Sequence, residues 1–210
     1  MFITETLNSY SRAAEIIARG GVIAFRTDTF YGLGADPFNR DAVQRIKQLK
    51  GREERQPILI VLSERAAVKR FVAEPSRAFQ LLADRFWPGP LTLIGDAVAE
   101  IPEEVTAGTK TIGVRLPDDD RVRALVQACG GALTATSANP SHEEPARTAP
   151  QVFSYFENGI DLIVDDGDVV TDLPSTVVDA CGVAPRLIRE GAIKWSAIRA
   201  ELSKPNVKRT

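Results

Sequence analysis

The strongest constraint on the fold is a run of five consecutive aliphatic residues, Ile58 to Leu62, directly after Pro57. Short apolar runs that are rich in β-branched residues are typical of buried strands. Similar runs recur along the chain, and segments with apolar residues at helical spacing lie between most of them. Because alternating strands and helices bury their apolar faces against one another, the sequence predicts an α/β fold with helices flanking a twisted mixed sheet.

The predicted elements are short. Strands are expected at 22–25, 58–62, 91–94, 111–115, 132–135, 162–164, 175–179 and 186–188. Helices are expected at 11–19, 63–71, 76–86, 121–129, 150–157 and 194–202, and after Asn39, which is a favourable N-cap. Ser63 is interpreted as the cap of the second of these helices. The stretch from Gly95 to Lys110 has no clear pattern.

Length and composition limit the classes of protein. The 210 residues are expected to form one domain, 1–210, in which 203–210 is a polar and basic tail. No apolar run is long enough to span a membrane, the N-terminus lacks a signal peptide pattern, and two cysteines are too few for a disulfide framework. A cytoplasmic location is therefore expected. The net charge of −2 argues against a chain that mainly coats nucleic acid.

Polar loops after strands are the candidate binding segments, because ligands of open α/β sheets bind where strands end. The nucleotide signatures GxxxxGK[ST] and GxGxxG after a strand do not occur in the sequence. The first candidate loop, Arg26–Gly34, carries two threonines, an aspartate and a tyrosine. It fits either a ligand-binding loop or a polar turn that satisfies its own backbone.

Basic residues mark two further candidate segments. Lys50 and Arg52 flank Gly51, where they fit either a surface charge cluster or a cationic lip for phosphates. Arg115 closes an apolar strand, so a guanidinium that faces the core there needs a carboxylate partner. The residues leave open whether that carboxylate belongs to the protein or to a ligand.

Hydroxyl groups gather after later strands. The stretch 134–141 carries four hydroxyls and an amide, which can bind the polar edges of a small ligand and are also typical of a turn. Ser175 begins the last expected hairpin, and Arg189 ends its second strand shortly before Gly191, which aims a guanidinium at a loop. The single histidine, His142, excludes a metal site that needs two histidines.

Taken in order, these segments resemble one known family. The motifs are Thr-Asp-Thr-x-Tyr-Gly-Leu-Gly from Thr27, Lys-Gly-Arg from Lys50, Trp-Pro-Gly-Pro-Leu-Thr from Trp87, Val-Arg-Leu-Pro from Val114, Thr-Ser-Ala-Asn from Thr136, Ser-Thr-Val-Val-Asp from Ser175 and Arg-Glu-Gly from Arg189. The series resembles the YrdC/Sua5 family, the threonylcarbamoyl-AMP synthases. The resemblance implies a YrdC-like fold and a nucleotidyltransferase that condenses L-threonine, bicarbonate or CO2, and ATP to threonylcarbamoyl-AMP and pyrophosphate for tRNA t6A37 synthesis.

The resemblance also implies roles for particular residues. Threonine would be bound by Thr29, Arg115 and Ser175. ATP would be bound by Lys50, Arg52, Gln56, Thr111, Ser137, Asn139 and Arg189, and Lys50 and Arg52 would be catalytic. Mg²⁺ is expected with ATP and no protein-only metal site is expected. The implied partner is the tRNA-threonylcarbamoyl transferase machinery.

Three residues depart from the family pattern. Gln56 stands where the family often has lysine, Val61 where some members have histidine, and His142 where glycine often follows. By this resemblance the chain is expected to be the short, single-domain form, without the extra C-terminal domain of the longer Sua5 branch. Two alternatives are a module that binds RNA and a paralogue with altered activity. The intact Lys-x-Arg and Ser-x-Asn pairs favour the synthase.

Overall fold

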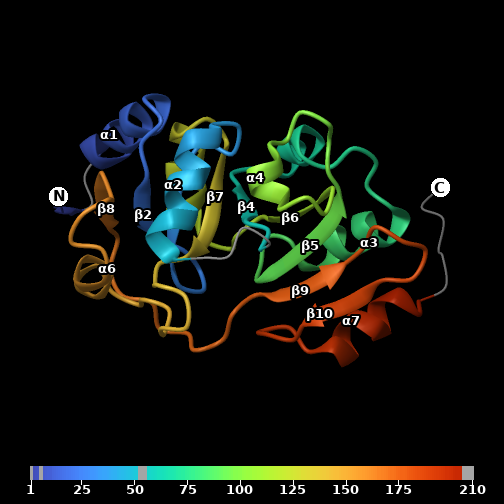
Figure 1. Cartoon of the computed structure of the whole chain (residues 1–210). Coiled ribbons are helices and arrows are strands. Elements are labelled where there is room, and N and C mark those ends of the chain that lie inside the picture. The colour runs from blue at the N-terminus through green and yellow to red at the C-terminus, as the bar shows by residue number, and fades with distance from the viewer. Residues whose placement is uncertain (1, 5–6, 52–55, 205–210) are drawn as a thin grey trace.

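A computed structural model describes residues 2–4, 7–51 and 56–204, and its strands form one ten-stranded mixed sheet (Figure 1). The strand order from edge to edge is β1 (Phe2–Thr4), β8 (Leu162–Asp165), β2 (Ile23–Arg26), β3 (Tyr31–Gly34), β7 (Ala132–Ser137), β4 (Leu59–Leu62), β6 (Thr111–Arg115), β5 (Leu91–Asp96), β9 (Thr176–Asp179) and β10 (Arg186–Arg189). Strand pairs β1–β8, β8–β2, β4–β6 and β5–β9 are parallel, and the others are antiparallel. The predicted α/β class is confirmed.

Helices cover both faces of the sheet. Apolar residues of α1 (Leu7–Ala18) and α5 (Asp120–Ala128) pack against β2, β8 and β7 in one core cluster. A larger cluster on the other face joins the sheet to α2 (Arg40–Lys50), η1 (Arg65–Arg70, a 3₁₀ helix), α3 (Arg77–Phe86), α4 (Glu103–Thr106), α6 (Ala149–Tyr155) and α7 (Trp195–Leu202). Figure 1 shows α1 and β8 at one end of the molecule and α7 with β10 at the other.

The strand register puts one row of side chains on the face that α1 and α5 cover only in part. Side chains alternate between faces along a strand, and directly paired residues point the same way. Arg115 pairs with Val61, Leu59 with Ala135, and Ile94 with Gly113. The strands β9, β5, β6, β4 and β7 therefore present these residues and their i±2 neighbours on a common face, where the site lies.

Most predicted elements are present, and every predicted strand lies within two residues of its expected ends. Asn39 caps its helix as predicted by accepting a hydrogen bond from Ala42 N, and Ser76 caps α3 by accepting one from Phe79 N. The prediction that Ser63 caps a helix is wrong. Its hydroxyl donates to Gln127 Oε1 and Gly131 O, and the following helix is a 3₁₀ helix without a side-chain cap. The predicted tail lies largely at 205–210, outside the described residues.

The structure adds three elements that the sequence did not predict: β1, α4 and β3. Strand β3 falls inside the loop expected at 26–34, where two glycines conceal its strand character. Gly34 lies against the Phe25 ring across the β2–β3 pair, and a Cβ there would lie 2.7 Å from Phe25 Cε1. The glycine is therefore required by the close packing of an aromatic ring.

Candidate active site

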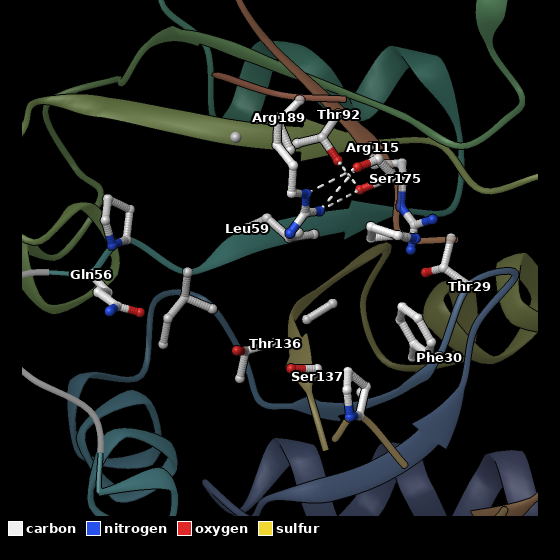
Figure 2. A pocket seen from close by; sticks show the side chains of 18 of the residues that line it. Thr29, Phe30, Gln56, Leu59, Thr92, Arg115, Thr136, Ser137, Ser175 and Arg189 are labelled. Carbon is white, nitrogen blue, oxygen red and sulfur yellow. Dashed lines mark hydrogen bonds between the residues drawn. The ribbon is translucent and has the colours of Figure 1, made fainter. Parts of the chain in front are cut away.

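A cavity of about 900 Å³ opens on the sheet face described above. Nine of the ten residues that the sequence analysis placed in a site line it: Thr29, Lys50, Gln56, Thr111, Arg115, Ser137, Asn139, Ser175 and Arg189. The tenth, Arg52, lies outside the described residues. Figure 2 shows Gln56 at one end of the cavity and Arg115 with Thr29 at the other, while Ser137 and Arg189 lie between them on facing walls.

The turn between β2 and β3 supplies Thr29. The Thr27 hydroxyl donates to Phe30 O at 2.7 Å and accepts from the backbone N–H groups of Thr29 and Phe30. Both expectations for this loop therefore hold in part: the turn satisfies its own backbone, and Thr29 from the same turn lines the cavity. Thr29 is itself buried.

Arg115 is paired with a carboxylate of the protein. Its Nη1 lies 2.7 Å from Asp28 Oδ1, and the side chains of Arg115 and Asp28 are only 3% and 11% exposed. The contact is not a well-formed hydrogen bond, because both Asp28 oxygens and Arg115 Nε and Nη1 lack a hydrogen-bond partner of good geometry within the described part of the chain. Burial lowers the pKa of Arg115, and the Asp28 charge opposes that shift.

A second guanidinium stands near the first. Arg189 donates from Nε and Nη2 to Ser175 O at 3.2 and 3.0 Å, and the Ser175 hydroxyl lies 3.0 Å from that of buried Thr92 (Figure 2). Desolvation and then the positive charge of Arg115 lower the pKa of Arg189. The described residues that line the cavity include two guanidiniums, Arg115 and Arg189, and no carboxylate, so this part of the cavity carries positive charge and suits an anion.

Lys50 contributes in a different way. Its side chain is buried, and Nζ donates to Ser137 O at 2.5 Å, Asn139 O at 2.7 Å and Asn139 Oδ1 at 3.4 Å. The Asn139 amide donates onward to Pro140 O and Glu143 O. Lys50 is therefore not part of a surface charge cluster. It fixes the loop that follows β7.

Several lining residues were not singled out by the sequence. Apolar side chains and one further hydroxyl complete the walls, among them Phe30, Leu59, Thr92, Ile94 and Pro145. Thr92 lies within a quoted motif, but only the β5–β9 pairing places it beside Ser175. Asp28 also lies within a quoted motif, yet its pairing with Arg115 depends on contacts between distant segments.

Within residues 2–4, 7–51 and 56–204, no group of three or more His, Cys, Asp or Glu side chains is arranged to hold a metal ion. Over the same part of the chain, no helix has the length and apolar character needed to cross a membrane.

Together, the mixed sheet and its cationic, hydroxyl-lined cavity define an α/β protein whose cavity suits a small anionic ligand. The chain belongs to the Sua5/YciO/YrdC family, whose model, described as "Telomere recombination", matches residues 15–191. A curated relative from Halorhodospira halophila, named threonylcarbamoyl-AMP synthase, is 40% identical over 152 residues, which cover 72% of this chain and 80% of the relative.

Two solved structures share the fold. Pyrococcus abyssi Sua5, complexed with L-threonine, aligns with a TM-score of 0.91 at 31% identity and covers 97% of this chain. This chain spans 60% of the length of that protein. Escherichia coli YciO aligns with a TM-score of 0.81 at 26% identity, covering 91% of this chain and 95% of its own.

Proposed function

We propose that the chain is an L-threonylcarbamoyladenylate synthase, a nucleotidyltransferase that uses L-threonine, bicarbonate or CO2, and ATP. The observation that carries the proposal is the convergence of nine signature residues from separate segments on one cavity. Curated relatives bear the same activity in their names, and a structural relative was solved with L-threonine. The cavity is roomy enough for two small ligands, given that drug-sized ligand sites range over roughly 300–1,000 Å³.

The end of the cavity at Arg115 suits the amino acid. A carboxylate is bound best by a guanidinium, and Arg115 is fixed by Asp28 before the ligand arrives. Thr29 and Ser175 line the same cavity with hydroxyl groups that can bind the polar groups of threonine. The buried setting strengthens each of these interactions, because water does not screen them.

The rest of the cavity is assigned to ATP. Lys50 and Asn139 hold the loop that carries Ser137, while Gln56 and Thr111 line the walls. Arg189 lies between the two regions, where its charge can stabilise the phosphate under attack. Arg52 keeps its predicted role as a phosphate ligand. Mg²⁺ is expected to arrive on the triphosphate, since this ion is commonly held by substrate phosphates and water.

The reaction needs no nucleophile from the protein. The threonine amine adds to CO2, or to bicarbonate with loss of water, and forms a carbamate. A carbamate oxygen then attacks the α-phosphorus of ATP, and pyrophosphate leaves. The protein contributes orientation and cationic groups that stabilise the charge on the phosphates. We further propose that the product is passed in the cytoplasm to a tRNA-threonylcarbamoyl transferase.

The test is pyrophosphate release with ATP, Mg²⁺ and bicarbonate, in the presence and absence of L-threonine. We expect release only with threonine, together with a product of the mass of threonylcarbamoyl-AMP. Arg189→Ala should lower kcat about 30- to 1000-fold, the effect typical of one well-placed donor. Arg186→Ala is the matched control, because Arg186 lies on the same strand and pairs with Asp179 outside the cavity.

The result also separates the alternatives. Release that does not depend on threonine contradicts the proposal and favours a paralogue with altered activity. A protein that releases no pyrophosphate but binds RNA, with an affinity that falls steeply as salt rises, would be the RNA-binding module instead. Equal losses in Arg189→Ala and Arg186→Ala would place the active site elsewhere.

A further inference from the structure

A strained residue lies in the loop after β7. His142 has a φ of +75°, in the left-handed region that side chains other than glycine rarely adopt. Glu143 N donates to Pro140 O, so residues 140–143 form a β-turn with His142 at its third position. A positive φ at that position is typical of a type II turn, where glycine is usual. Histidine therefore occupies a position that glycine would occupy at lower cost.

The surrounding contacts hold this conformation in place. Asn139 Nδ2 donates to Pro140 O at 2.8 Å and to Glu143 O at 2.7 Å, and so closes the turn from inside. Ser141 N donates to Lys50 O at 2.8 Å. Since Lys50 Nζ also binds Asn139, the loop is tied to α2 just before the turn and within it. Strained residues persist where the neighbouring structure enforces them, and they cluster at functional sites.

His142 also lines the cavity, although its side chain is exposed to solvent. Its neighbours in the chain and across it, Ser141, Lys50 and Gly51, line the same cavity. An exposed position at the mouth suits a phosphate, because a phosphate keeps part of its hydration when it is bound. It suits an adenine base less well, because the base is desolvated on binding. The imidazole has an N–H donor in either charge state, so it can bind a phosphate oxygen without first being protonated.

We propose that His142 is a further nucleotide-binding residue, whose imidazole donates a hydrogen bond to the triphosphate of ATP at the mouth of the cavity. This inference rests on the proposed function. It also explains the backbone strain, because the strained turn aims the imidazole at the ligand from a rigid support. His142→Gly should accordingly weaken triphosphate binding without lowering the stability of the fold.

The experiment measures the affinity of the full chain for inorganic triphosphate with Mg²⁺, and separately for adenosine, by calorimetry. We expect His142→Gly to weaken triphosphate binding about tenfold, as for one hydrogen bond to a charged group, and to leave adenosine binding unchanged. The midpoint of thermal unfolding should stay the same or rise. His142→Asn should lose less affinity, because asparagine tolerates a positive φ and keeps a donor.

Ala107→Gly is the matched control, because Ala107 has a φ of +51° outside the cavity and should leave both affinities unchanged. Unchanged triphosphate affinity in His142→Gly overturns the inference and leaves the proposed function intact. A loss confined to adenosine also overturns it and indicates stacking on the base. A parent protein that binds neither ATP nor triphosphate contradicts the proposed function, and this inference with it.

Discussion

Lys50 and Arg115 are both cations that line one cavity, yet their surroundings differ. The ammonium of Lys50 is used by the protein, because it donates to Ser137 and Asn139 and so fixes a loop. The guanidinium of Arg115 is held by one carboxylate, Asp28, in poor hydrogen-bond geometry and lies near a second guanidinium, Arg189. The hydrogen-bond donors of Lys50 are used by the protein, whereas Arg115 and Arg189 together leave donors and positive charge for a ligand.

The comparison shows that two signature cations can serve different purposes. A loop that presents hydroxyl groups must be rigid, so its cation is used in hydrogen bonds to carbonyls. A site that binds a carboxylate must keep donors and charge available. Substitutions of these two residues should therefore change stability and ligand binding in different ways, and both changes can be measured.

The largest effect is expected for Arg115→Met. It leaves the Asp28 carboxylate buried without a countercharge, which typically costs about 3–5 kcal/mol. Denaturant unfolding would measure this loss. The double variant Asp28→Asn with Arg115→Met removes both charges and should recover most of the stability, but threonine binding should stay lost. Recovery of threonine binding in the double variant would mean that Arg115 serves only as the partner of Asp28.

A smaller loss is expected for Lys50→Met, which keeps the length of the side chain and removes its donors. Buried carbonyls of Ser137 and Asn139 then lose a partner, at a cost of about 1–3 kcal/mol for an unsatisfied buried group. Unfolding and the KM for ATP should change together, because the loop that carries Ser137 is no longer fixed. Full stability with a low kcat would instead mean that the ammonium acts on the phosphates.

The smallest effect is expected for an ion pair outside the cavity. Arg45 and Asp161 are each 36% exposed in their side chains, so solvent screening limits the pair to about 0–1 kcal/mol. Burial raises the pKa of Asp161, but hydrogen bonds from Arg45 and Val22 N outweigh it, and the net shift is downward.

The sign of the pH effect follows from that shift. Because the pKa of Asp161 is lower in the folded state, the pair stabilises the fold above about pH 4, and the contribution is lost as the pH falls through the lower folded value. Asp161→Asn should therefore be slightly less stable than the parent at neutral pH and indistinguishable from it near pH 2. Measuring the unfolding free energy across this range tests the sign. A larger difference at low pH would contradict it.

The sequence predicted those parts of the molecule that depend on local pattern. The aliphatic run at 58–62 is typical of a buried strand, and Asn39 is a cap whose hydrogen bond closes within three residues. The ordered motifs selected nine of the residues that line the cavity. Local pattern failed where packing between distant segments decides the structure: β3 is hidden by two glycines, of which Gly34 makes room for the Phe25 ring.

The roles of charged residues were harder to predict than their location. Lys50 was expected at a lip for phosphates, but its burial and its bonds to the loop after β7 depend on a contact across 87 residues. The Asp28–Arg115 pair likewise depends on the side-by-side packing of the β2–β3 turn and β6. Spacing in the sequence gives no information on such pairs, because the sheet order brings them together.

The order of strands also determines how much of the chain must be synthesised before the cavity can form. Strand β9 pairs in parallel with β5, and β10 then pairs with β9 at the edge of the sheet. Ser175 and Arg189 therefore line a cavity together with Thr29, which is synthesised much earlier. A nascent chain that ends before β9 can fold much of its sheet before Ser175 and Arg189 complete the cavity. The complete cavity thus requires synthesis of the chain through Arg189.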